Sequence, residues 1–202
     1  MIKNTSTQTL THTNNAIIAI KLGGSLVYSD NLRCCLDSIE QRYRGRAVVI
    51  VPGGGVFADQ VRLAQQHWQF DEGTAHAMAL LAMQQMALLF NGLKRHFVIV
   101  GSVAQVRLQS ALNQTVIWSP DIVELEQAGI RPSWDITSDS LAAWLAGVLP
   151  ADELVLVKSA KIDAALGLAE LAGQGIIDDA FCDIVANASF QIKIINVHDF
   201  NG

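Results

Sequence analysis

The chain has 202 residues, half of them hydrophobic and 16% charged, and its formal net charge is −5. A chain of this length can bury its own hydrophobic core, and its acidic balance argues against a nucleic-acid binder that relies on a basic surface. No apolar run approaches the roughly 18 residues of a membrane span, so no membrane association is expected. Three cysteines, two of them adjacent, do not suggest a disulfide framework and favour a cytoplasmic protein.

Short apolar runs alternate with longer amphipathic stretches along the chain. Residues 1–15 are rich in Thr and Asn without periodicity, which predicts a flexible tail before a single domain over 16–202. Strands are predicted at 16–22, 46–52, 96–102, 114–120, 153–159 and 191–197. Helices are predicted at 30–43, 56–67, 73–92, 103–112, 138–149 and 178–188. This alternation predicts an α/β fold with a mainly parallel central sheet and helices on both faces.

The first predicted strand ends in Lys21-Leu22-Gly23-Gly24-Ser25. In parallel sheets, ligands bind beyond the carboxyl ends of the strands. Consecutive glycines let the backbone approach an anion closely, and Lys21 adds a positive charge. The spacing is neither that of a P-loop nor that of a dinucleotide fingerprint. The structural alternative is a tight turn beside a solvated lysine.

A second glycine cluster, Gly53-Gly54-Gly55, follows the next predicted strand and opens a predicted helix. Three glycines before a helix form a nest of amides at the positive end of the helix dipole, which suits a phosphate or a carboxylate. A turn alone needs only one or two glycines. Two such clusters after successive strands favour an anion site.

The segment 134–140 leads into the helix predicted at 138–149. Thr137 or Ser138 is a candidate N-cap, and Asp139 falls in the first turn, where the helix dipole favours a carboxylate. Capping alone leaves Asp135 and its aromatic neighbour unexplained.

Two further positions have competing interpretations. Lys158 leaves the fifth predicted strand and could face a phosphate or plain solvent. His76 lies on a helix striped with Ala and Met, so a core role competes with a substrate contact. The other four histidines show no metal-ligand spacing with cysteines or carboxylates, and no metal site made by the protein is expected.

In this order, the motifs resemble the amino acid kinase family. KLGGS is similar to that family's Lys-x-Gly-Gly-Ser, VPGGG to its second glycine loop, and SDSLAAWLA to its Asp-x-x-Ala-Ala helix start. The resemblance covers about residues 16–197 and implies a three-layer α/β sandwich. It implies that Lys21 and the amides of Gly23 and Gly24 hold the phosphoryl group in transit, and that Asp139 orients Lys21 by an ion pair.

The resemblance also divides the chain into an acceptor half, about 16–150, and a nucleotide half, about 151–202. The residues it implies for the acceptor are Gly53, Gly54 and Gly55 on the phosphate, with Asp135, Thr137 and His76 nearby. In the nucleotide half we expect Lys158 to meet the phosphates of ATP, with Ser25, Ser159 and Lys161 nearby. Mg²⁺ would bridge the ATP phosphates, and a homo-oligomer is expected.

Within the family, PGGGVFADQVR, GTAHAMALLAMQQ and WDITSDSLAAWLA look closest to the small kinases of methanofuran biosynthesis. That similarity implies transfer from ATP to the phosphate of 5-(aminomethyl)-3-furanmethanol phosphate, with Asp135 facing the ammonium group. Larger family members carry a late Gly-Gly-Met-x-x-Lys, whereas GLAELAGQGIIDDAFCDIV here has no lysine, so Lys158 or Lys161 would supply that charge. The alternatives are a kinase acting on uridylate or isopentenyl phosphate, and a nucleotide- or metabolite-binding regulator without turnover.

Overall fold

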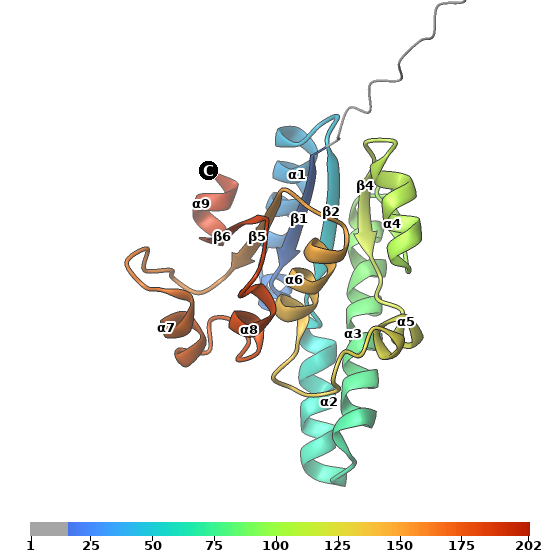
Figure 1. Ribbon diagram of the computed structural model, residues 1–202, viewed down its shortest axis with the longest axis vertical. Coiled ribbons are helices and arrows are strands. Elements are labelled where there is room, and N and C mark those ends of the chain that lie inside the picture. The colour runs from blue at the N-terminus through green and yellow to red at the C-terminus, as the bar shows by residue number, and fades with distance from the viewer. Residues whose placement is uncertain (1–15) are drawn as a thin grey trace, which may run out of the picture.

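Six parallel strands form one sheet in the computed structural model, which describes residues 16–202 (Figure 1). Across the sheet the strands are β3 (Val98–Val100), β4 (Thr115–Trp118), β2 (Ala47–Pro52), β1 (Ile17–Leu22), β5 (Glu153–Lys158) and β6 (Gln191–Asn196). All six lie within the predicted segments, and the predicted parallel sheet is confirmed. The tail predicted at residues 1–15 lies outside the described residues.

Nine α-helices and one 3₁₀ helix connect these strands within the described part of the chain. They are η1 (Gly24–Tyr28), α1 (Asn31–Arg42), α2 (Gly55–Trp68), α3 (Glu72–Leu93), α4 (Val103–Ser110), α5 (Ile122–Gln127), α6 (Ser138–Val148), α7 (Leu168–Gly173), α8 (Phe181–Val185) and α9 (Val197–Asn201). The helix predicted at 178–188 is wrong in length, because α8 begins only at Phe181 and ends at Val185. Helices η1, α5, α7 and α9 were not predicted, since five or six residues are too few to show a helical period.

Helices cover both faces of the sheet, as predicted. Alternate side chains of each central strand enter two hydrophobic cores. One core holds residues of α4 to α8, and the other holds residues of α1 and α9. Helix α3 contributes to both, and α2 packs against it beyond the carboxyl ends of the strands (Figure 1).

The carboxyl ends of β2, β1 and β5 lie side by side in the middle of the sheet. Leu22 of β1 is in register with Pro52 of β2 and with Val157 of β5. The connection from β1 to β2 passes along one face through α1, whereas α6 enters β5 from the other face. A change of face between neighbouring strands opens a crevice at the carboxyl edge, which is the usual ligand site of such sheets.

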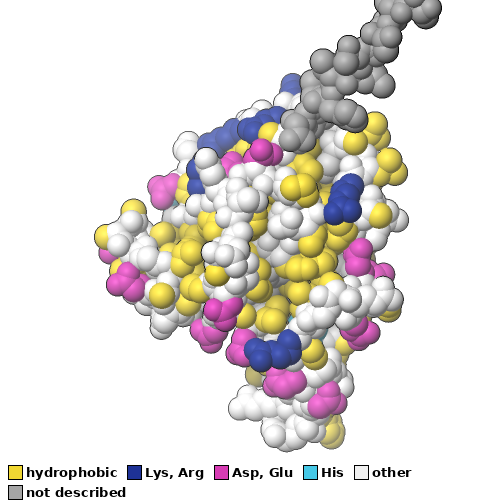
Figure 2. Space-filling view, in the orientation of Figure 1, with side chains coloured by type: hydrophobic (Ala, Val, Ile, Leu, Met, Phe, Trp, Pro, Cys, Tyr) yellow, Lys and Arg dark blue, Asp and Glu magenta, His cyan; other side chains and the backbone are white. Residues whose placement is uncertain are grey.

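Charged side chains are unevenly distributed on the surface. Acidic side chains are spread over the face shown in Figure 2, and basic side chains gather mainly along its upper edge, away from the carboxyl ends of the strands. Within residues 16–202, no helix has the length and apolar character of a membrane span.

Candidate active site

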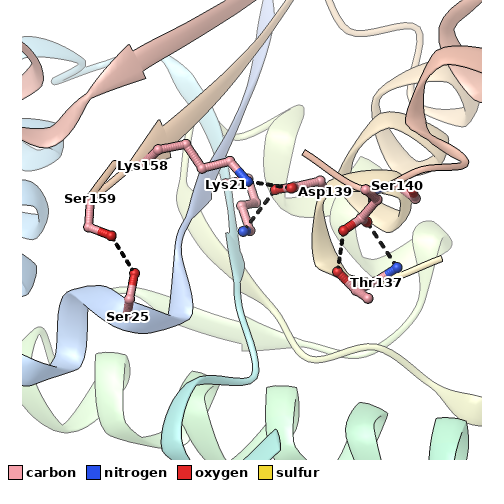
Figure 3. Close-up of polar contacts among 8 residues, drawn as sticks. Lys21, Ser25, Thr137, Asp139, Ser140, Lys158 and Ser159 are labelled. Carbon is pink, nitrogen blue, oxygen red and sulfur yellow. Dashed lines mark hydrogen bonds and ion pairs between the residues drawn. The ribbon is translucent and has the colours of Figure 1, made fainter. Parts of the chain in front are cut away.

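Two lysines meet one buried carboxylate at the carboxyl edge of the sheet. Strand alternation turns Lys21 of β1 and Lys158 of β5 toward the same face, where the first turn of α6 presents Asp139. The Lys21 Nζ lies 2.8 Å from the Asp139 Oδ1, and the Lys158 Nζ donates to the Oδ2 (Figure 3). The ion pair predicted between Asp139 and Lys21 is present, and Lys158 joins it.

Burial makes this cluster electrostatically unusual. The side chains of Lys21, Asp139 and Lys158 are 6%, 4% and 11% exposed. Burial alone would raise the pKa of Asp139, but Lys21 and Lys158 outweigh it and lower that pKa. Burial, with repulsion from Lys21, lowers the pKa of Lys158 to about 8, although Asp139 opposes the shift. Two ammonium groups on one carboxylate leave a net positive charge, which would stabilise a bound anion.

The two glycine loops touch each other beside this cluster. A Cβ on Gly24 would overlap the backbone nitrogen of Gly55, and a Cβ on Gly53 would lie 2.5 Å from the nitrogen of Gly24. Gly55 also has a φ of +54°, which disfavours other residues. The glycines therefore permit contact between two backbones, in addition to any contact with a ligand.

Two of the glycine amides are already used. The Gly23 amide donates to the Val157 carbonyl at 3.1 Å, and the Gly53 amide donates to the Leu22 carbonyl at 2.9 Å. The sheet hydrogen bonding thus continues one residue past β1 and β2, so both amides already have acceptors within the protein, and their contact with phosphates stays a prediction. Gly24 begins η1 and Gly55 begins α2, and the first amides of a helix have no acceptor within it.

A cavity of about 250 Å³ lies beside the glycine loops. Helices α2 and α3 and the segment 134–138 form its walls, with Leu80, Met83 and Trp134 among the apolar side chains. The guanidinium of Arg62 lies 3.8 Å above the Trp134 ring, and the Trp134 indole donates to the Gln65 Oε1 at 2.6 Å. Trp134 is therefore fixed against α2 at the edge of the cavity.

The cavity carries a carboxylate that the sequence analysis missed. Asp59 of α2 lines it, and the Tyr28 hydroxyl donates to the Asp59 Oδ2 at 3.0 Å. Gly55, Asp59 and Arg62 recur at helical spacing and share one face of α2, a signal that the sequence already contained.

The predicted acceptor residues behave differently from one another. Thr137 and His76 line the cavity, and burial lowers the pKa of His76, which favours a neutral imidazole. Asp135 is exposed, and its carboxylate lies 3.7 Å from Arg131. Its neighbours on both sides, 134 and 136, line the cavity but Asp135 does not, so its contact with an acceptor stays a prediction.

On the β5 side, the structure separates the two candidate lysines. Lys158 joins the buried cluster, whereas Lys161 is exposed. The hydroxyls of Ser25 and Ser159 lie 2.7 Å apart and bridge η1 to the loop after β5 (Figure 3). Among residues 16–202, no group of three or more His, Cys, Asp or Glu side chains is arranged to hold a metal ion.

Comparison with known proteins agrees with this geometry. A family model described as "Amino acid kinase family" matches residues 16–161. The (5-(aminomethyl)furan-3-yl)methyl phosphate kinase of Methanocaldococcus jannaschii is 26% identical over 145 residues, which are 68% of this chain and 63% of that protein. The matched region thus spans less than two thirds of that relative's length.

Solved structures share the fold at lower identity. Uridylate kinase from Archaeoglobus fulgidus superposes with a TM-score of 0.70 at 17% identity, covering 91% of this chain and 93% of that chain. An isopentenyl phosphate kinase superposes with a TM-score of 0.58 at 13% identity, covering 90% of this chain and 91% of that chain.

Proposed function

The chain belongs to the amino acid kinase family, and we propose that it is a phosphotransferase that transfers the γ-phosphoryl group of ATP to a phosphate monoester. The proposed acceptor is 5-(aminomethyl)-3-furanmethanol phosphate. The main support for the proposal is the buried cluster of Lys21, Asp139 and Lys158 at the carboxyl edge of the sheet, with a cavity beside the neighbouring glycine loops. Phosphoryl transfer depends mainly on positioning and on neutralising charge, and this cluster supplies both.

Lys21 and Lys158 would bind the phosphoryl group as it moves. Asp139 holds both ammonium groups in place before the reaction, so no ordering of either lysine is needed during transfer. The acceptor phosphate is largely ionised near neutral pH, with a second pKa of about 6, so it needs no general base. Lys158 would provide the cation that the late stretch of this chain lacks.

The cavity fits an acceptor that combines a flat ring with a positive charge. Its apolar walls and Trp134 suit the ring, and the Asp59 carboxylate suits an ammonium group. The relative from Methanocaldococcus jannaschii is named for an aminomethylfuran phosphate. Uridylate and isopentenyl phosphate carry no ammonium group, so Asp59 favours the aminomethyl compound over both.

ATP would approach from the β5 side, near Ser25, Ser159 and Lys161. Mg²⁺ would accompany ATP and neutralise part of its phosphate charge. Lys21 and Lys158 already occupy the carboxylate of Asp139, and the nearby side chains of Ser25 and Ser159 are hydroxyls, so the ligands of Mg²⁺ would come mainly from the phosphates and water. We also propose a cytoplasmic homo-oligomer. Exposed leucines along α3, Leu81 and Leu88, provide apolar surface for self-association, which light scattering on the purified protein would test.

The test measures ADP release by the full chain with three acceptors: the aminomethylfuran phosphate, uridylate and isopentenyl phosphate. We expect a diphosphate product, detected by mass spectrometry, with the first acceptor. Lys21→Ala should lower kcat about 100- to 1000-fold, because a preorganised charge at the transferring group is lost. Preference for either other acceptor would overturn the substrate, and ATP binding without transfer to any acceptor would favour the regulator alternative.

A further inference from the structure

A carboxylate from far along the chain holds the first turn of α6. The Asp178 Oδ2 accepts hydrogen bonds from the amides of Thr137 and Ser140, each at 2.9 Å. The Oδ1 accepts from the Thr137 hydroxyl at 2.6 Å. Thr137 is the N-cap residue of α6, yet its side chain makes no capping bond of its own. Asp178 therefore satisfies donors that a helix leaves free at its start.

Asp139 lies between the two residues that Asp178 binds. Its backbone is thus fixed on both sides, at Thr137 and at Ser140. A second contact joins the same segments, because the Ala180 amide donates to the Asp135 carbonyl at 3.2 Å. The segment 178–180 consequently holds the chain on which Asp139 stands.

We propose that Asp178 is a positioning residue for phosphoryl transfer: it fixes the first turn of α6 so that Asp139 presents one oxygen to Lys21 and the other to Lys158. The expected effect of Asp178 on turnover rests on the proposed function. Asp178 lies in the late stretch that has no lysine, so that stretch would act on the cluster through Asp139 instead of supplying a cation.

Charge provides a second link from Asp178 to the cluster. The charged groups that act on Lys158 are Lys21, Asp139 and Asp178. Burial and Lys21 lower the pKa of Lys158, whereas Asp139 and then Asp178 raise it. Removal of the Asp178 charge should therefore lower the Lys158 pKa further, an effect that a merely structural cap would not produce.

The experiment compares Asp178→Asn with Asp179→Asn, which makes the same change at an exposed neighbour. An asparagine oxygen can still accept from the two amides, but its NH₂ group cannot accept from the Thr137 hydroxyl. We expect kcat to fall about tenfold in Asp178→Asn with little change in KM for ATP. If turnover uses the charged form of Lys158, kcat of the parent should decline as pH rises through the pKa of that lysine, about 8, and this decline should begin at lower pH in Asp178→Asn. Asp179→Asn should match the parent in both respects.

NMR titration of ¹³C-labelled lysine side chains measures the Lys158 pKa and does not depend on turnover. If the parent were inactive, the proposed function would be disproved, but the effect of Asp178 on the Lys158 pKa could still be measured. The Lys158 midpoint should fall in Asp178→Asn. In Asp178→Glu, which keeps the charge but displaces the carboxylate, the midpoint should stay near that of the parent while kcat falls; this variant also serves if the asparagine variant does not fold. An unchanged midpoint, or an unchanged kcat in both variants, would overturn the proposal.

Discussion

Replacing Lys158 with methionine should make the protein more stable and much less active. The pKa of Lys158 falls from 10.5 to about 8, chiefly because burial disfavours the charged form. At about 1.36 kcal/mol per pKa unit, the charged lysine destabilises the fold at pH 7 by about 3 kcal/mol relative to a neutral one. Methionine keeps most of the volume without the charge. The free energy of unfolding should therefore rise by up to about 3 kcal/mol, less the lost hydrogen bond to Asp139.

Turnover should move in the opposite direction. Lys158→Met removes one of the two cations held at the transferring group, which should lower kcat by about 30- to 1000-fold, or about 2–4 kcal/mol. The sequence analysis placed Lys158 on the ATP phosphates, where its loss would chiefly raise KM for ATP. Its pairing with Asp139 in the buried cluster now predicts the larger effect on kcat.

Chemical denaturation at pH 7, paired with kcat measurements, tests both effects, and Lys161→Met is the matched control because that lysine is exposed. The folded pKa of Lys158 lies below its unfolded value, so the unfolded chain binds more protons between about pH 8 and 10.5. This group therefore makes the parent more stable as pH rises through that window, and Lys158→Met should lack its contribution. A variant less stable than the parent, or one with normal kcat, would refute the reasoning.

Two further substitutions test the cavity and the glycine contact. Asp59→Asn should raise KM for the aminomethyl acceptor about tenfold without changing KM for ATP, because the amide has no charge for an ammonium group; equal effects from Asp135→Asn, outside the cavity, would contradict this. Gly24→Ala should lower both thermal stability and activity, because its Cβ overlaps the Gly55 nitrogen. The control is Gly92→Ala, where a Cβ meets nothing within 4 Å and should stabilise α3 by up to about 1 kcal/mol. A normal melting temperature for Gly24→Ala would rule out the close contact between Gly24 and Gly55.

The parts of the fold that the sequence predicted are those with local signals. Continuous apolar runs identify strands that are covered on both faces. A parallel sheet could therefore be predicted without knowing which strands lie next to each other. Because strands in a parallel sheet end at one edge, the motifs after them converge. The pairing of Asp139 with Lys21 was predicted from the family resemblance, since the local sequence alone placed Asp139 only in the first turn of a helix.

Other features of the site depend on long-range contacts, which local sequence does not reveal. The Gly23 amide is used by Val157, and Asp178 caps a helix that begins 40 residues earlier, and neither partner can be identified from local sequence. Asp135 was chosen for its charge, but the direction of its side chain depends on which neighbours face the cavity. Asp59 was overlooked although its spacing from Gly55 was available, because the helix face toward the cavity was unknown.

The source of the second cation illustrates how the sheet constrains the chemistry. β1 and β5 are hydrogen-bonded neighbours, and alternate residues of each face α6. A lysine near the carboxyl end of either strand therefore points toward the same helix start, whatever follows later in the chain. Position 158 satisfies this condition and position 161 does not, because the strand has ended. Without a late lysine, the proposed phosphate site would thus still hold two cations as long as α6 keeps Asp139 within reach of both strands, which is the role that we propose for the contacts of Asp178.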